Sequence, residues 1–162
     1  MNKKILSGNK KRVLDACCGA KMFWFDKNNQ DVVFQDVRRE SHTLCDGRKL
    51  VISPDVLADF RNMPYEDECF FLVVFDPPHL RKIGTTSLMG KKYGRLPDDW
   101  KKMIREGFDE CMRVLKPNGT LIFKWNERDI PIRTLIGVIG REPLFGYTTK
   151  SGGHTIWMAF MK

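Results

Sequence analysis

Apolar residues in this chain of 162 residues gather into short continuous runs, several of which end in an aspartate. Continuous runs of Val, Leu and Phe are typical of strands that a parallel sheet buries on both faces. We predict such strands at residues 12–15, 31–36, 55–59, 70–76 and 120–125. The first four end at Asp15, Asp36, Asp59 and Asp76.

Apolar residues at intervals of three and four predict a helix that starts after Pro97 with an acidic first turn and ends at residues 116–119. Its stripe, which we expect to pack on the sheet, consists of Ile104, Phe108, Cys111, Met112 and Leu115. A short helix is predicted at residues 21–27, with Met22, Phe23 and Phe25 turned inward, and another helix after Pro131.

Two hairpins complete the pattern. Asp46-Gly47 lies between two strand-like runs, in the arrangement favoured by a type I′ turn, and predicts a hairpin over residues 41–52 as an insertion on the sheet edge. Residues 144–149 and 155–161 predict a C-terminal antiparallel pair. Residues 1–162 are therefore expected to form a single α/β domain with a mostly parallel sheet and a C-terminal antiparallel hairpin.

A run of small residues follows the first predicted strand: Ala16, Cys17, Cys18, Gly19 and Ala20. Small residues at such a turn let the backbone approach a ligand closely. Asp15 and Asp36 are separated by about 20 residues, as are a nucleotide-binding turn and its ribose-binding acid. This spacing predicts a compact, Rossmann-like βαβ unit.

The run 72–79 ends abruptly in Asp76-Pro77-Pro78-His79. Proline cannot donate a hydrogen bond to a sheet, so the strand is expected to stop at Asp76. Two prolines in succession make a rigid corner that presents one carboxylate, free carbonyls and an imidazole. Ligands of open α/β sheets bind at the carboxyl ends of the strands, so we predict that this corner is the active site. The alternative is a tight turn without chemistry.

The chain carries 28 basic and 20 acidic residues, a formal net charge of +8, which indicates a polyanionic partner such as nucleic acid. A basic surface that serves only solubility is the alternative. The glycine-punctuated loop at residues 80–97 is predicted to bind phosphates and stack on a base, or else to be a solvated flexible loop. Its candidate residues are Arg81, Lys82, Lys91, Lys92, Tyr93 and Arg95. Lys124 and Trp125 end the next strand and could line the same cleft, although Trp125 could equally belong to the core.

No stretch is typical of a signal peptide or a membrane span, so a cytoplasmic protein is expected. The five cysteines are an odd number and include no Cys-x-x-Cys pair, so neither a disulfide framework nor a zinc ribbon is indicated. His42 with Cys45 is the nearest thing to a metal-ligand pair and is more typical of a strand surface.

This order of strands, acids and motifs resembles the class I S-adenosylmethionine-dependent methyltransferases over nearly the whole chain. Asp76-Pro77-Pro78-His79 resembles the Asp/Asn-Pro-Pro-aromatic motif of the enzymes that methylate amino groups in nucleic acid, including small phage and prophage proteins. His79 stands where the motif usually has Tyr, Phe or Trp.

The resemblance implies that S-adenosylmethionine is the cofactor and assigns its contacts. Residues 15–19, that is Asp15, Ala16, Cys17, Cys18 and Gly19, would wrap its methionine part. Asp36 would accept hydrogen bonds from its ribose hydroxyls, and Asp59 with Phe60 would flank its adenine.

At the corner, Asp76 and the Pro77 carbonyl would accept the amino hydrogens of the target base, and no metal is required. His79 would stack on that base, or alternatively accept a proton. Adenine in DNA is the expected substrate. The alternatives are a base in RNA and a non-catalytic nucleic-acid-binding module. Since no target-recognition domain is evident, we expect either low sequence specificity or sequence readout that a homodimer or a separate specificity partner supplies.

Overall fold

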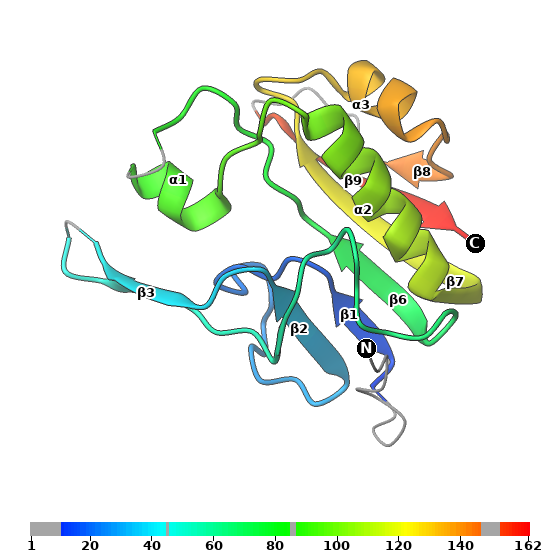
Figure 1. Cartoon of the computed structure of the whole chain (residues 1–162), viewed down its shortest axis with the longest axis horizontal. Coiled ribbons are helices and arrows are strands. Elements are labelled where there is room, and N and C mark those ends of the chain that lie inside the picture. The colour runs from blue at the N-terminus through cyan, green and yellow to red at the C-terminus, as the bar shows by residue number, and fades with distance from the viewer. Residues whose placement is uncertain (1–10, 45, 85–86, 147–152) are drawn as a thin grey trace.

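The computed structural model describes residues 11–44, 46–84, 87–146 and 153–162. A seven-stranded sheet forms its centre (Figure 1). Its strands are β1 (Val13–Asp15), β2 (Val32–Asp36), β5 (Val56–Leu57), β6 (Phe70–Phe75), β7 (Leu115–Asn126), β8 (Phe145–Gly146) and β9 (Thr155–Met161). They lie in the order β5-β2-β1-β6-β7-β9-β8. The first five in this order run parallel, and β9 runs antiparallel to both of its neighbours.

The predicted fold class, α/β with a mostly parallel sheet and a C-terminal antiparallel pair, is therefore confirmed. The five parallel strands fall within or around the apolar runs that predicted them. β6 ends at Phe75, one residue before Asp76, so the Asp-Pro-Pro corner begins directly at the carboxyl end of the strand. The predicted C-terminal pair is confirmed for residues 145–146 and 155–161, and residues 147–152 lie outside the described ranges.

Three helices are described: α1 (Leu88–Tyr93), α2 (Trp100–Val114) and α3 (Ile132–Ile139). Helices α2 and α3 lie side by side on one face of the sheet (Figure 1). Of the predicted stripe, Ile104, Phe108 and Cys111 are buried there with almost no exposed surface. Met112 is half-buried, and Leu115 already belongs to β7 because the helix ends at Val114. The acidic first turn was wrong, because the helix begins at Trp100 and Asp99 occupies the position before it.

The helix predicted at residues 21–27 was wrong. Lys21 adopts a left-handed backbone conformation with φ of 54°, and the Asp26 side chain accepts a hydrogen bond from Asn28 N. Such local side-chain bonds compete with helix formation. Of the three side chains expected to turn inward, Met22 and Phe25 are exposed, whereas the Phe23 ring packs edge-on against Trp157.

The segment predicted as a loop at residues 80–97 contains helix α1. Ser87 Oγ accepts a hydrogen bond from Gly90 N at the start of the helix, and Gly94 ends it with φ of 72°. Serine before a helix and glycine after it are common end signals. In the sequence both stand among basic residues and glycines without apolar periodicity, which is why the helix was not predicted.

The hairpin predicted at residues 41–52 is confirmed as β3 (Glu40–Thr43) paired antiparallel with β4 (Lys49–Ile52). It forms a separate two-stranded sheet that projects from the body of the protein (Figure 1). Its connection is longer than a two-residue type I′ turn, since Leu44 N donates to Arg48 O and Gly47 N to Leu44 O.

Within the described ranges, no helix combines the length and apolar character that crossing a membrane requires. The same residues contain no group of three or more His, Cys, Asp or Glu side chains that could hold a metal ion.

Candidate active site

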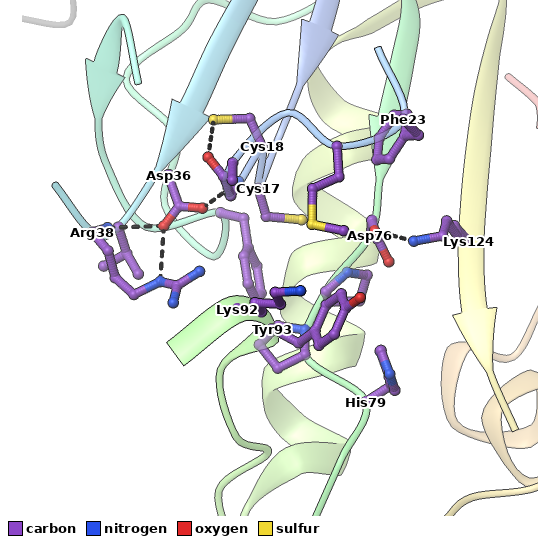
Figure 2. A pocket seen from close by; sticks show the side chains of 17 residues that line it. Cys17, Cys18, Phe23, Asp36, Arg38, Asp76, His79, Lys92, Tyr93 and Lys124 are labelled. Carbon is purple, nitrogen blue, oxygen red and sulfur yellow. Dashed lines mark hydrogen bonds and ion pairs between the residues drawn. The ribbon is translucent and has the colours of Figure 1, made fainter. Parts of the chain in front are cut away.

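A cavity of about 270 Å³ opens at the carboxyl ends of β1, β2 and β6 (Figure 2). Four segments supply its walls: the turn after β1, the end of β2, the Asp-Pro-Pro corner and helix α1. Single residues from the loop after β5 and from β7 complete it. The lining residues are Cys17, Cys18, Gly19, Ala20, Met22, Phe23, Asp36, Val37, Arg38, Phe60, Asp76, Pro77, Pro78, His79, Lys92, Tyr93 and Lys124.

Asp15 and Ala16 lie beneath the turn after β1 and do not line this cavity. Asp15 is fully buried, and its carboxylate accepts hydrogen bonds from Trp24 Nε1 at 2.6 Å and from Cys17 N at 3.4 Å. Burial raises the pKa of Asp15 to about 7. Asp15 therefore holds the turn in place, while Cys17, Cys18 and Gly19 face the cavity.

The Asp36 carboxylate ties the turn to the end of β2. Asp36 Oδ2 accepts a hydrogen bond from Gly19 N at 2.8 Å, and Oδ1 accepts one from Arg38 N at 2.9 Å. Arg38 Nε lies 3.3 Å from the same Oδ1. Oδ1 thus has two donors, whereas Oδ2 has one and can still accept a hydrogen bond from a ligand hydroxyl.

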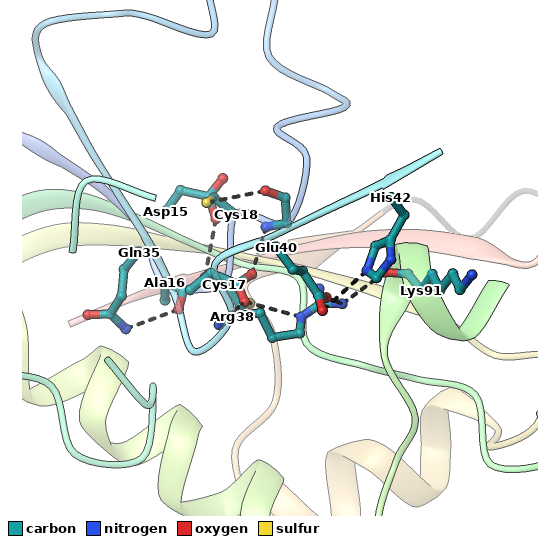
Figure 3. A network of polar contacts seen from close by, with 11 residues as sticks. Asp15, Ala16, Cys17, Cys18, Gln35, Arg38, Glu40, His42 and Lys91 are labelled. Atoms are coloured by element: carbon teal, nitrogen blue, oxygen red, sulfur yellow. Dashed lines mark hydrogen bonds and ion pairs between the residues drawn. The ribbon is translucent and has the colours of Figure 1, made fainter. Parts of the chain in front are cut away.

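Arg38, which sequence reasoning missed, also holds helix α1 over the cavity. Its Nη1 donates to Lys91 O at 2.9 Å and lies 3.3 Å from Glu40 Oε1 (Figure 3). Glu40 is in turn 3.2 Å from His42 Nε2. The network joins the end of β2, the hairpin and α1, and its only signal in the sequence is an arginine two residues after the strand-end acid.

At the Asp-Pro-Pro corner, Lys124 Nζ of β7 lies 2.5 Å from Asp76 Oδ2 (Figure 2). Both side chains are mostly buried, at 19% and 15% exposure. Burial raises the pKa of Asp76 above its usual value, while Lys124 opposes this shift. Asp76 Oδ1 has no hydrogen-bond donor among the described residues. Trp125, the other residue considered for this cleft, is in the core and donates to Ile130 O.

His79 is buried between two aromatic rings. Its ring centre lies 5.7 Å from that of Tyr93 and 6.3 Å from that of Trp125. Burial lowers the pKa of His79, which favours the neutral imidazole. A neutral ring next to Tyr93 can pack against a flat aromatic ligand.

A second, smaller cavity of about 120 Å³ adjoins the first. Asp76, His79, Tyr93 and Lys124 line both cavities and so lie at their junction. The remaining lining residues are Met89, Asn126 and Thr155, none of which sequence reasoning singled out. Asn126 Nδ2 donates to Thr155 Oγ1 at 3.1 Å, and because these residues are far apart in sequence, only the β7–β9 pairing brings them together.

Asp59 is not among the residues that line either cavity. Its carboxylate pairs with Arg61 at 2.7 Å, and this hydrogen-bonded partner lowers its pKa. The neighbouring Phe60 does line the larger cavity, where it packs edge-on against Phe75.

The six basic-loop residues divide into two groups. Lys92 and Tyr93 line the larger cavity, and Arg38 binds the carbonyl of Lys91. Arg81, Lys82 and Arg95 lie on the exposed surface beyond the cavities. Asp129 Oδ2 accepts from Arg81 N at 2.8 Å, and Arg95 Nε donates to Arg81 O at 3.1 Å, so this part of the segment is anchored.

No protein-family model and no curated protein sequence matches the chain. Among solved structures, it is similar to an S-adenosylmethionine-dependent methyltransferase of the DUF858 family from Leishmania major, with a TM-score of 0.50 and 14% identity over 96% of this chain and 67% of the other. The PH0226 protein from Pyrococcus horikoshii OT3 gives a TM-score of 0.53 and 15% identity over 94% and 84% of the two chains. The chain has a class I methyltransferase fold. At these identities the likeness establishes the fold alone.

Proposed function

We propose that this protein transfers a methyl group from S-adenosylmethionine to an exocyclic amino nitrogen of a base in nucleic acid, with adenine in DNA as the preferred target. The observation that carries the proposal is that Asp76, His79, Tyr93 and Lys124 line both cavities. Residues at such a junction can hold a carboxylate beside the point where a methyl donor in one cavity would meet a flat base in the other.

The larger cavity suits the cofactor by its chemistry. Gly19 has φ of 51°, and the position that a Cβ would take lies 3.9 Å from Lys92 O, so the turn offers a backbone surface without a side chain to the methionine part. Asp36 would accept the ribose hydroxyls, and Phe60 with Val37 would contact the adenine ring. The bound cofactor would supply a methyl group on a positively charged sulfur.

The Asp76 carboxylate is the central group in the proposed reaction. Lys124 holds Oδ2, which leaves Oδ1 and the Pro77 carbonyl to accept the amino hydrogens and turn the nitrogen lone pair toward the methyl group. The N–C bond forms as the S–C bond breaks, with the electron pair of that bond remaining on sulfur. The carboxylate stabilises the positive charge that develops on nitrogen and accepts the excess proton.

His79 and Tyr93 would hold the plane of the base in the smaller cavity, where Asn126 and Thr155 provide polar groups at its edge. A base inside a duplex cannot reach Asp76, so a duplex substrate would have to extrude it. The net charge of +8 and the exposed Arg81, Lys82 and Arg95 support a polyanionic substrate.

The test is to incubate the protein with S-adenosylmethionine labelled on the methyl group and, in parallel, with duplex DNA, single-stranded DNA and total RNA. We expect label in the DNA pools, and N6-methyl-2′-deoxyadenosine as the labelled nucleoside after digestion. Label on an RNA base would retain the chemistry and change the substrate. Absence of label from all three pools, with cofactor binding intact, would refute the proposal.

A further inference from the structure

A third cavity lies between the turn after β1 and the hairpin β3–β4. Its volume of about 460 Å³ exceeds that of both the larger cavity and the smaller cavity of the candidate active site. Five of its lining residues are basic: Lys21, Lys27, Arg48, Lys49 and Lys92. No aspartate or glutamate is among the described residues that line it. We call this cavity the basic groove, and its charge is suited to an anionic ligand.

Three cations of the basic groove have no acidic partner in the described part of the chain: Lys27, Lys49 and Lys92. The other two are partly engaged. Arg48 pairs with Asp46 at 2.5 Å, and Lys21 Nζ donates to Lys27 O while lying 3.9 Å from the centre of the Phe34 ring. Unpaired ammonium groups gathered around one depression create a local field that attracts phosphate.

The hairpin supplies one wall of the basic groove. Its pairing ends at Thr43 and Lys49, so Lys49 lies next to the turn of the hairpin. The hairpin itself projects from the body of the protein (Figure 1). Lys27, on the opposite wall, belongs to the segment after β1, and both lysine side chains are exposed. The position of Lys49 opposite Lys27 therefore depends on the hairpin, which is inserted between β2 and β5.

The basic groove is continuous with the candidate active site. Gly19, Ala20, Met22 and Lys92 line both the basic groove and the larger cavity. Lys92 of helix α1 is followed directly by Tyr93, which lines the smaller cavity where the base is proposed to lie. A nucleic acid strand bound at Lys92 would thus lie next to Tyr93, the side chain that is proposed to contact its base.

We propose that the basic groove binds the sugar-phosphate backbone of the nucleic acid strand whose base enters the active site. The inference rests on the proposed function and extends it by giving the hairpin a role. Contacts to phosphate fix the position of a protein on nucleic acid without reading sequence. The hairpin accordingly provides part of the surface that binds the substrate.

The test compares the double variant Lys27→Gln/Lys49→Gln with the wild-type protein by fluorescence anisotropy, using a labelled 20-nucleotide single-stranded DNA and the duplex of the same sequence. The matched control is Lys116→Gln/Lys162→Gln. This control also removes two positive charges. Lys116 lies at the start of β7 and Lys162 just after β9, at the end of these strands opposite to Asp76.

We expect the groove variant to bind both DNA probes about tenfold more weakly at 0.1 M salt, and its log–log salt slope to be shallower by about 2, one for each lost phosphate contact. Its affinity for S-adenosylmethionine should be unchanged, because neither lysine lines the larger cavity. The control should change affinity less than twofold.

Wild-type affinity and salt slope in the groove variant would overturn the inference, as would an equal loss in the control. If the groove variant loses binding while the wild-type protein transfers no methyl group to any nucleic acid, the inference stands and the proposed function fails. If the wild-type protein methylates DNA and the groove variant binds as tightly, the proposed function stands and the inference fails.

Discussion

Lys124 Nζ lies 2.5 Å from Asp76 Oδ2, across the carboxyl ends of two neighbouring parallel strands. The pair places the positive charge of Lys124 beside the Asp76 carboxylate, which would bind the amino group of the base. A buried carboxylate is costly to ionise, and an adjacent ammonium group reduces that cost. We infer that Lys124 keeps Asp76 in the ionised form that the proposed reaction needs.

Replacement of Lys124 by Met should shift the pH dependence of activity. Asp76 must be ionised, so activity is present above its pKa and is lost as the pH falls through it. Burial raises this pKa and Lys124 lowers it, so removal of the lysine should move the acid limb of kcat/KM to higher pH. Lys124→Arg keeps the charge and should leave the limb near its wild-type position. An unshifted limb in Lys124→Met would contradict this role.

Arg38→Ala should loosen helix α1. The hydrogen bond from Arg38 Nη1 to Lys91 O is lost, and with it the tie from α1 to Asp36. We expect faster amide hydrogen exchange in residues 88–94 and weaker binding of S-adenosylmethionine by about tenfold or more, because hydrogen bonds to charged groups contribute roughly 1.5–3 kcal/mol. Arg39→Ala is the control, since Arg39 Nη2 donates to Pro54 O and no hydrogen bond joins this side chain to α1 among the described residues. Equal exchange in the two variants would argue against the tie.

Gly107→Ala should destabilise the protein. A methyl group at Gly107 would lie 2.6 Å from Phe60 Cδ2 and 2.8 Å from Phe75 Cζ, so helix α2 would be pushed from the sheet. We expect a loss of about 1–3 kcal/mol in the free energy of unfolding, measured in urea, together with weaker cofactor binding because Phe60 lines the larger cavity. Gly137→Ala in α3 meets no atom within 4 Å and should stabilise by about 0.5–1 kcal/mol. Equal effects of the two substitutions would contradict the close packing.

Asp15→Asn should change how stability depends on pH. The pKa of Asp15 rises from 3.8 in the unfolded chain to about 7 in the folded protein, so the folded form binds the extra proton between these values. The free energy of unfolding of the wild-type protein therefore falls as pH rises from about 4 to about 7, by at most about 4 kcal/mol from this group. Asn keeps an oxygen for Trp24 and has no such dependence. Urea unfolding should find the variant more stable than wild type at pH 8 and similar at pH 4, whereas parallel pH profiles would exclude this account.

The parallel strands and the Asp-Pro-Pro corner could be predicted because their signals are local. Buried strands are apolar throughout, and proline ends a strand wherever it occurs, so Asp76 had to stand at a sheet edge. The turn after β1 was predicted for a similar reason. The helix predicted at residues 21–27 does not form, because Lys21 takes a left-handed conformation and Asx turns replace helical bonds.

What the sequence could not predict depends on contacts between distant residues. The bond from Arg38 to Lys91 O spans 53 residues, and the pair Asn126–Thr155 spans 29. The position of Asp59 outside the cavity also follows from its bond to Arg61, which is one of many arrangements the sequence allows. The sequence therefore predicted the Asp-Pro-Pro corner but did not determine which residues surround it in space.

The most direct measurement of the central claim is a comparison of methyl transfer and cofactor binding in the wild-type protein and in Asp76→Ala. With labelled S-adenosylmethionine and the DNA pool that accepts label, the variant should lose more than about 1,000-fold in transfer, because the group that accepts the amino hydrogens is gone. Its dissociation constant for the cofactor, measured by calorimetry, should stay within about threefold of wild type. Methyl transfer by Asp76→Ala at near wild-type rates would contradict the central role of this carboxylate, and a large loss of cofactor binding would place Asp76 in the cofactor site instead.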